Sequence, residues 1–232
     1  MKEPLVSIVI ANYNYAHLVG DAIESALGQT YKNKEIVVLD NGSTDNSLEV
    51  IEQYPVFSLV QDQNGGKIGA AWNAVVAAST GEYLVILSAD DMLCPLHLEM
   101  TVPVLNAAIP STGWVNTWVN VFGERVGVWQ TAPFHFPLLK VGNCISCSSL
   151  MRRSMWDEVG GYRDISYGDA FVSHDWDFWL RAAHKGYKGA LVPIPLLNYR
   201  VHSDSLMETH QMGPEMQAAI RKANPEIYGG ER

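Results

Sequence analysis

The stretch LVILSADDM, residues 84–92, joins a short apolar run to two adjacent carboxylates, Asp90 and Asp91. The run is long enough for one buried strand, and a buried strand seldom ends in paired charges without a reason. At an effective dielectric constant of ~20, unit charges ~5 Å apart repel each other by roughly 3 kcal/mol. Either both side chains point into water, or a positive group lies between them.

The residues before this stretch alternate between strand and helix patterns. Apolar, β-branched runs predict strands at residues 5–10, 35–39, 57–60 and 83–87. Helical patterns fill the intervals at residues 18–27, 46–51 and 68–79, and Asn46 with Glu49 resembles a capping box. This order predicts an α/β fold with a single, mostly parallel, Rossmann-like sheet. Such sheets bind ligands beyond the carboxyl ends of their strands.

Polar residues directly follow three of the four predicted strands. They form three clusters: Asn12, Tyr13 and Asn14; residues 40–43, which begin with Asp40; and the Asp90–Asp91 pair. Because the carboxyl ends of parallel strands meet at one edge of a sheet, we expect these clusters to line one crevice.

The second half of the chain has a different character. We expect a helix at 96–109 that Pro103 bends or shortens, a Trp- and Val-rich hairpin at 112–130 turning at 123–125, and a strand at 145–151. A helix at 175–185, an extended segment at 191–201 whose two prolines suit a sheet edge, and a helix at 215–223 follow. We interpret residues 1–232 as one domain, with functional halves at about 1–92 and 93–205 and a tail at 206–232.

Composition excludes several classes of protein. The chain has 232 residues and a net charge of −9, without the basic stripe of a nucleic-acid binder. Its apolar runs are shorter than the ~20 residues of a membrane span, and its N-terminus lacks a signal peptide's cleavage site. Three cysteines indicate a reducing, cytoplasmic compartment rather than a disulfide framework. A phosphorylated ligand would need a local cation or a helix N-terminus, because the overall charge repels it.

A series of motifs resembles the family-2 glycosyltransferases with the GT-A fold. In chain order they are VSIVIANYN, EIVVLDNGSTDNS, STGEYLVILSADD, VGGYRD and HDWDFWLRAAHKGY. The resemblance implies an inverting transfer of a sugar from a nucleotide-diphosphate donor, expected to be UDP-linked, to a glycan or lipid-linked acceptor. It implies a role in building envelope polysaccharides, with peripheral contact at the inner membrane face where the acceptor is a lipid. The donor sugar, the acceptor and the oligomeric state stay open.

The same resemblance assigns the acidic pair to a divalent metal, Mg²⁺ or Mn²⁺, hard cations that suit oxygen ligands. Asp91 resembles the direct metal ligand, Asp90 the contact to ribose or to a metal-bound water, and His202 a further metal ligand. The alternatives are an N-cap for the acidic pair and an ordinary histidine. Many members read Asp-x-Asp-Asp, and this chain has Ser88 at the first position.

The resemblance places the donor nucleotide near the ends of the first two strands. It implies that Asp40 binds the base through an imide N–H, that Tyr13 stacks on the ring, and that Asn12 belongs to this site. Lys67 and Arg200 are candidate contacts to the donor, Arg200 to its diphosphate. Turn formation is the alternative for Asp40 and Asn12, and a solvated side chain is the alternative for Lys67.

Asp175 is the predicted catalytic base, because it matches the aspartate of the family's Glu-Asp motif. His174 replaces the glutamate and is an alternative base, while an N-cap is the alternative for Asp175. Asp177 lies roughly 200° further around the predicted helix and should face elsewhere. Cys144 and Cys147 form a C-x-x-C that fits buried small side chains better than a metal site. The tryptophans are predicted to pack in the core, with a sugar platform as the alternative.

Three other functions compete with this interpretation. A catalytically degenerate relative that binds nucleotide sugars without turnover would explain Ser88 and His174. A nucleotidyltransferase would need a glycine-rich loop near the N-terminus, and VSIVIANYN has none. A dinucleotide-binding dehydrogenase would need G-x-G-x-x-G after the first strand, which is also missing.

Overall fold

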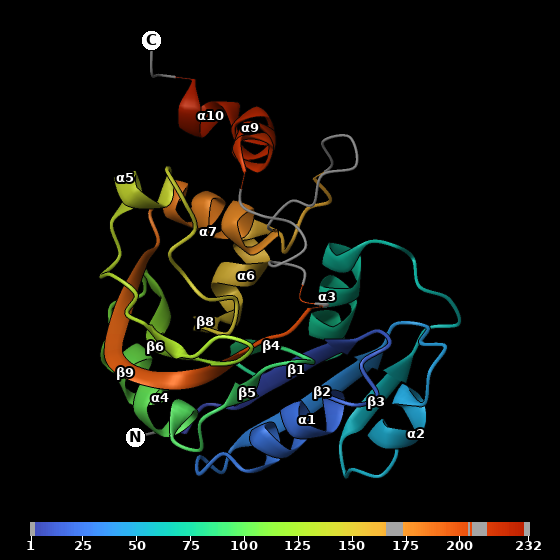
Figure 1. The fold of residues 1–232 in the computed structure, drawn as a ribbon. Helices are drawn as coiled ribbons and strands as arrows, with labels where there is room; N and C mark the ends of the chain where they lie inside the picture. Colours follow the sequence, from blue (N-terminus) through green and yellow to red (C-terminus); the bar gives the residue numbers. More distant parts are fainter. Residues whose placement is uncertain (1–2, 166–173, 204, 206–212, 230–232) are drawn as a thin grey trace.

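The first half of the chain forms a parallel sheet with helices on both faces. A computed structural model describes residues 3–165, 174–203, 205 and 213–229 of the protein. The strands β1 (Val6–Asn12), β2 (Lys34–Asp40), β3 (Phe57–Val60) and β4 (Tyr83–Ser88) lie in the order β3-β2-β1-β4, all parallel (Figure 1). The predicted strands and their parallel pairing are therefore confirmed.

Alternation along the central strands sends side chains into two separate cores. Ile8 and Ile10 of β1 pack with α1 (Val19–Leu27) and α2 (Ser47–Ile51), whereas Val9 packs with α3 (Ile68–Ala77). Both faces of β1 are buried, so its sequence is a continuous apolar run rather than an alternating one. The predicted capping box does not form. Asp45 caps instead: its Oδ1 accepts from the backbone N–H of Ser47 at 3.0 Å.

The second half extends the same sheet through antiparallel pairs and one parallel pair of strands. The full order is β3-β2-β1-β4-β8-β6-β9-β5, with β7 paired to β6, and it includes nine strands among the described residues. The added strands are β5 (Met92–Leu93), β6 (Thr112–Gly123), β7 (Gly127–Trp129), β8 (Leu150–Arg152) and β9 (Lys188–Val201). The predicted hairpin is present as β6–β7, which turns after Gly123 with φ 98°.

Two details of this half differ from the sequence expectations. β9 pairs with β6 along its length, and the two-residue β5 pairs with it only at Leu197 and Asn198, so β9 has one neighbour at its prolines, as an edge would, and two neighbours near its end. Its prolines are accommodated where the β6–β9 register shifts, between Thr117↔Val192 and Trp118↔Pro195. The strand predicted at 145–151 starts only at Leu150, because the preceding serines form a turn in which Ser149 Oγ donates to Asn116 Oδ1 at 3.1 Å.

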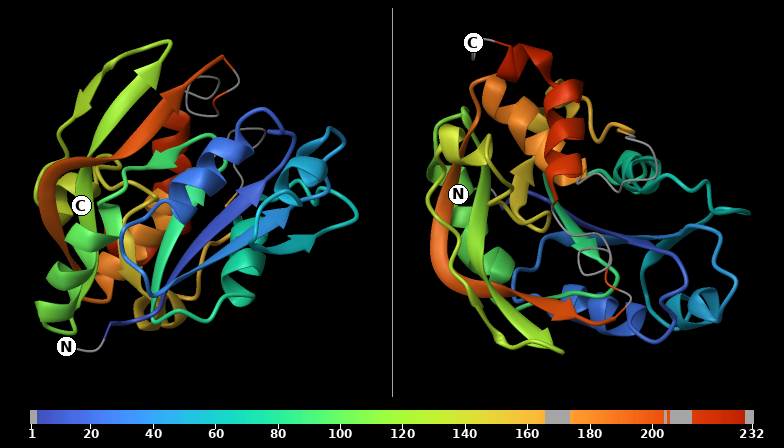
Figure 2. Two further views of the ribbon diagram at one scale, coloured as in Figure 1. Left: turned by 90° about the horizontal axis from the view of Figure 1, so that it is seen from below. Right: turned by 45° about the horizontal axis from the view of Figure 1, so that its top comes forward.

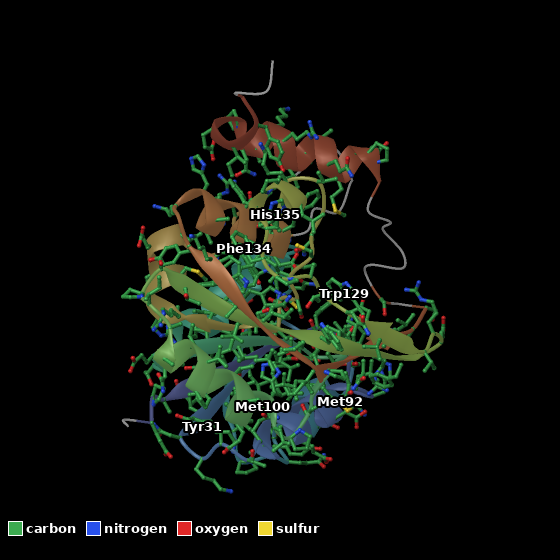
Figure 3. The ribbon with its side chains drawn as sticks, turned by 90° about the vertical axis from the view of Figure 1, so that its left-hand side faces the viewer. Tyr31, Met92, Met100, Trp129, Phe134 and His135 are labelled. Carbon is green, nitrogen blue, oxygen red and sulfur yellow. The ribbon has the colours of Figure 1, made fainter. Side chains whose placement is uncertain are left out.

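The remaining helices cover the second half of the sheet. They are α4 (His97–Ala107, with Pro103 inside it), α5 (Phe136–Leu139), α6 (Arg153–Val159), α7 (His174–His184), α9 (Pro214–Ala223) and α10 (Pro225–Tyr228). Helices α9 and α10 lie over α7 and α5, away from the parallel strands (Figures 1 and 2). Figure 3 shows Phe134 and His135, just before α5, between the sheet and these C-terminal helices. No described helix is long and apolar enough to cross a membrane.

Candidate active site

The turn after β4 places the acidic pair beside the end of β9. Asp91 is 2% exposed, and its Oδ1 accepts from the backbone N–H of Arg200 at 2.9 Å. Burial raises the pKa of Asp91 well above its usual range. The charge of Asp90 raises it further, and Arg200 opposes both effects. Asp91 therefore ties the turn to β9, and its ionised form is stabilised only in part by Arg200.

Asp90 faces His202, the first residue after β9. Its Oδ2 lies 3.2 Å from Nε2 of His202, and each side chain is 17% exposed. The histidine is held from two directions, since its backbone N–H donates to Ser205 Oγ at 3.1 Å and its ring meets the edge of Tyr15 at 5.7 Å. An oxygen and an imidazole nitrogen thus converge near the surface.

Arg200 is engaged by the protein on several sides. Its Nη2 contacts Asp21 Oδ2 at 2.6 Å, and its Nε donates to the backbone carbonyl of Asp90 at 3.0 Å. The guanidinium also lies 4.7 Å from the ring centre of Phe122. Arg200 therefore braces the acidic turn, and a contact to a diphosphate would require it to share or leave Asp21.

Asp40 and Asn12 lie side by side at the ends of β2 and β1, as their register pairs them. Asp40 is 3% exposed and accepts from Ser43 Oγ at 2.6 Å, from the Ser43 backbone N–H at 3.0 Å and from Asn12 Nδ2 at 3.1 Å. Tyr13 is 41% exposed. The following Asn14 adopts φ 58°, and its Oδ1 accepts from the Thr44 backbone N–H at 2.8 Å. The carboxylate is thus fixed, and the exposed Tyr13 directly follows Asn12 in the chain.

Lys67 lies directly before α3, and its side chain is 64% exposed. Its Nζ contacts Asp164 Oδ2 at 3.1 Å, in a surface pair of the kind that contributes little to stability. The lysine is therefore available to a ligand at low cost.

Asp175 lies in the first turn of α7, and both of its carboxylate oxygens are oriented by neighbours. Oδ1 accepts from the backbone N–H of Trp176 at 2.8 Å, and Oδ2 accepts from Asn143 Nδ2 at 2.8 Å. His174 precedes it, and burial lowers the pKa of that imidazole. Asp177 faces away, as predicted, into the protein interior.

Cys147 lies beside the end of β4, the strand that precedes the acidic pair. Its Sγ lies 3.9 Å from Ser88 Oγ at the end of β4. Burial raises the pKa of its thiol to about 12, and the charges of Asp175 and Asp91 add to this shift. Asn143, in the same loop, donates to Asp175, so this loop connects the end of β4 to the predicted base. All three cysteines of the chain are free.

Several residues of the site carried no signal in the sequence. Asn143, Asp21 and Tyr15 contact the predicted side chains, but each lies in a loop or on a helix where its residue type is ordinary. The tryptophan prediction holds for Trp114, Trp176 and Trp179, which are at most 1% exposed, whereas Trp129 is 41% exposed (Figure 3). Within the described ranges, no group of three or more His, Cys, Asp or Glu side chains could hold a metal by itself.

Comparison with known proteins identifies the class to which this fold and site belong. The sequence model of Glycosyl transferase family 2 matches residues 7–160, and the chain therefore belongs to this family and is a glycosyltransferase. One relative is the Escherichia coli protein WfaP, named a UDP-Glc:alpha-D-GlcNAc-diphosphoundecaprenol beta-1,3-glucosyltransferase. It is 28% identical over 206 residues, which cover 87% of this chain and 79% of WfaP.

Solved structures confirm the GT-A fold. Residues 1–349 of Staphylococcus aureus TarS, in complex with UDP-GlcNAc, superpose with a TM-score of 0.80 at 14% identity, covering 96% of this chain and 66% of that one. The mannosyltransferase PcManGT from Pyrobaculum calidifontis, in complex with GDP-Man and Mn²⁺, gives a TM-score of 0.68 at 19% identity, covering 99% and 73%. This chain thus spans about two thirds of the TarS chain.

Proposed function

We propose that the protein is an inverting glycosyltransferase that moves a sugar from a nucleotide-diphosphate donor to a glycan or lipid-linked acceptor. The observation that carries the proposal is the loop of residues 143–147, which contacts Asp175 through Asn143 at 2.8 Å and Ser88, at the end of β4, through Cys147 at 3.9 Å. This loop connects the candidate base to the strand that leads into the acidic pair. The donor complexes of TarS and PcManGT, and the lipid-linked acceptor in the name of WfaP, support this substrate class.

The donor nucleotide would bind at the ends of β1 and β2. Asp40 is held by Ser43 and Asn12, so its carboxylate is already oriented to accept from an N–H of the base. Tyr13 would stack on the ring of the base, since it is exposed and directly follows Asn12, the residue paired with Asp40. Lys67 would approach the donor from the start of α3. We expect a uridine nucleotide, and the binding test below includes the guanosine alternative.

A divalent cation would bind at Asp90 and His202 rather than at Asp91. The Asp90 and His202 ligand atoms are 3.2 Å apart and partly exposed, whereas Asp91 is buried and already accepts from the Arg200 backbone. A carboxylate and an imidazole are suitable ligands for Mn²⁺. Mg²⁺ is the alternative, and it would be coordinated by carboxylate and phosphate oxygens. When bound, the cation would supply Lewis-acid stabilisation of the leaving diphosphate. Asp91 would then hold the turn after β4 in place through its hydrogen bond with the Arg200 backbone.

Asp175 would act as the general base. Its carboxylate would take the proton of the acceptor hydroxyl while that oxygen attacks the anomeric carbon from the side opposite the diphosphate. Asn143 and the Trp176 backbone N–H hold the two carboxylate oxygens, which limits the rotation of the side chain. The displacement needs no covalent intermediate, so Asp175 never bonds to the sugar.

The test is Asp175→Asn, with Asp157→Asn on the exposed face of α6 as the matched control. Titration with UDP or GDP in the presence of Mn²⁺ should give the same affinity for both variants as for the wild type. Turnover should fall by ~10²–10⁴ in Asp175→Asn alone, which is the usual contribution of general-base catalysis. A parallel loss of nucleotide affinity and turnover would contradict the role as base.

The alternative is a relative that binds nucleotide sugars without turnover. Ser88 supports it, because this position contacts Cys147 and supplies no carboxylate. Release of UDP from UDP-glucose or UDP-GlcNAc, or of GDP from GDP-mannose, with Mn²⁺ and water as the acceptor, separates the two functions. Nucleotide binding without any release under these conditions would favour the alternative.

A further inference from the structure

Asp177 is the centre of a buried clamp at the start of α7. Its side chain is fully buried and accepts from Arg163 Nε at 3.0 Å, from Arg181 Nε at 2.8 Å and from Asn224 Nδ2 at 2.8 Å. Burial alone would raise the pKa of Asp177, but hydrogen bonds from Arg163 and Asn224 and the charge of Arg181 hold it below its usual value. The carboxylate thus stays ionised inside the protein.

The clamp joins three parts of the chain. Arg181 also donates to the carbonyls of Val159 and Gly161, at 2.6 Å each, and so fixes the segment after α6. Asn224, at the junction of α9 and α10, accepts from Arg163 Nη2 at 2.9 Å. The first turn of α7, which carries Asp175, is therefore fastened to the C-terminal helices.

The C-terminal helices also reach the loop that holds the other side of Asp175. Tyr228 of α10 donates to the carbonyl of Lys140 at 3.0 Å, and Gln217 of α9 donates to that of Val141 at 3.5 Å. Asn143, which donates to Asp175 Oδ2, follows two residues later. In Figure 1, α9 and α10 lie over both α5 and α7, in agreement with these contacts.

We infer that α9 and α10 form a brace that positions Asp175 from two sides, through Asn224 on Asp177 and through Tyr228 on the loop before Asn143. This inference rests on the proposed role of Asp175 as the base. The brace lies outside residues 7–160, which match the family model. Asn224 and Tyr228 are positioning residues in it, because they contact Asp175 only through other groups.

Hydrogen-bond geometry, rather than packing alone, argues for a positioning role. Buried ionic networks are weak evidence for stability, since apolar residues of similar volume often stabilise as much. The apolar contacts of α9, made by Met216, Ala219 and Ile220, already bury this helix against the core around Trp176 and Trp179. The clamp adds a fixed orientation for the turn that contains Asp175.

The test is a double-mutant cycle between Asn224→Ala and Asp175→Asn, read as release of UDP or GDP from the nucleotide sugar that the wild type turns over. Asn224→Ala should lower kcat about tenfold and leave the nucleotide affinity within about twofold, because the donor site lies on β1 and β2. In the Asp175→Asn background, the same substitution should cost almost nothing, since the group that it positions is gone. Tyr228→Phe, which keeps the ring, should repeat this pattern with a smaller effect.

Met216→Ala is the matched control, because it weakens α9 packing without removing a hydrogen bond of the clamp. It should lower the melting temperature and leave kcat unchanged at a temperature where the variant is folded. An equal loss of kcat from Asn224→Ala in both backgrounds, or an equal loss from Met216→Ala, would overturn the brace. If Asp175→Asn itself keeps full turnover, the proposed base fails instead, and the two failures are thereby distinguished.

Discussion

His97 should make the stability of the protein depend on pH below neutrality. It is fully buried at the start of α4, where its Nδ1 contacts the carbonyl of Leu196 at 3.2 Å and its Nε2 has no partner among the described residues. Burial lowers the pKa of the imidazole from 6.5 to about 4, and the Leu196 carbonyl opposes the shift only in part. The folded protein therefore keeps His97 neutral where the unfolded chain protonates it.

The sign and size of the effect follow from this difference in pKa. Above about pH 6.5 both states are neutral at His97, so this group adds no pH dependence. Between pH 6.5 and about 4 the unfolded state binds one more proton, and the free energy of unfolding falls by about 1.4 kcal/mol per pH unit. The total loss is on the order of 3 kcal/mol, a large part of a typical stability of ~5–15 kcal/mol.

Urea unfolding at several pH values, from about pH 7.5 to about pH 4.5, measures this loss. His97→Gln is the comparison, because the amide can still donate to Leu196 and does not titrate. Carboxylates contribute equally to both proteins, so the difference between their unfolding free energies isolates His97. This difference should be constant above pH 6.5 and should then move against the wild type by about 1.4 kcal/mol per pH unit. Parallel curves across the whole range would refute the reasoning.

Three further predictions follow from the packing and the site. Gly189→Ala should destabilise the protein by about 1–3 kcal/mol in urea unfolding, because the new methyl group would overlap the buried indole of Trp114; Gly127→Ala, where the space is open, is the control. Asp40→Asn should weaken UDP binding by about tenfold or more in calorimetry, because a charge-assisted hydrogen bond would be lost. An unchanged affinity would mean that the uracil ring binds elsewhere. His202→Ala should raise the Mn²⁺ concentration for half-maximal turnover at least ~10-fold, and an unchanged metal titration would remove His202 from the metal site.

Local patterns were sufficient to predict the parallel half of the fold. The apolar run of β1, from Val6 to Asn12, is buried on both faces, and only a central strand of such a sheet requires that pattern. Because parallel strands bring their carboxyl ends together, the nearness of Asn12 to Asp40 also followed from the order of the elements. The hairpin turn at Gly123 was also predictable, because glycine is the residue that most readily adopts a positive φ, here 98°.

Long-range pairing could not be predicted in this way. β9 was expected at an edge because of its prolines, and at Pro195 it pairs only with β6; its pairing with β5 at Leu197 and Asn198 carried no signal in the sequence. That pairing also decides where Arg200 and His202 meet the acidic turn, far away along the sequence. We propose Asp90 rather than Asp91 as the metal ligand because the backbone N–H of Arg200 in β9 donates to Asp91. The types of these residues gave no indication of that hydrogen bond.

The charges of the site give a physical reason for a cation. The chain carries a net charge of −9, and the two cations among the predicted donor contacts both have acidic partners: Arg200 pairs with Asp21, and Lys67 pairs with Asp164. A diphosphate entering beside Asp90 would therefore meet like charge, and unit charges ~5 Å apart repel each other by roughly 3 kcal/mol at an effective dielectric constant of ~20. The imidazole of His202, beside Asp90, is a side chain that commonly binds dications. This arrangement supports the proposed cation at Asp90 and His202, because the paired arginine and lysine would offset only part of the charge of the diphosphate.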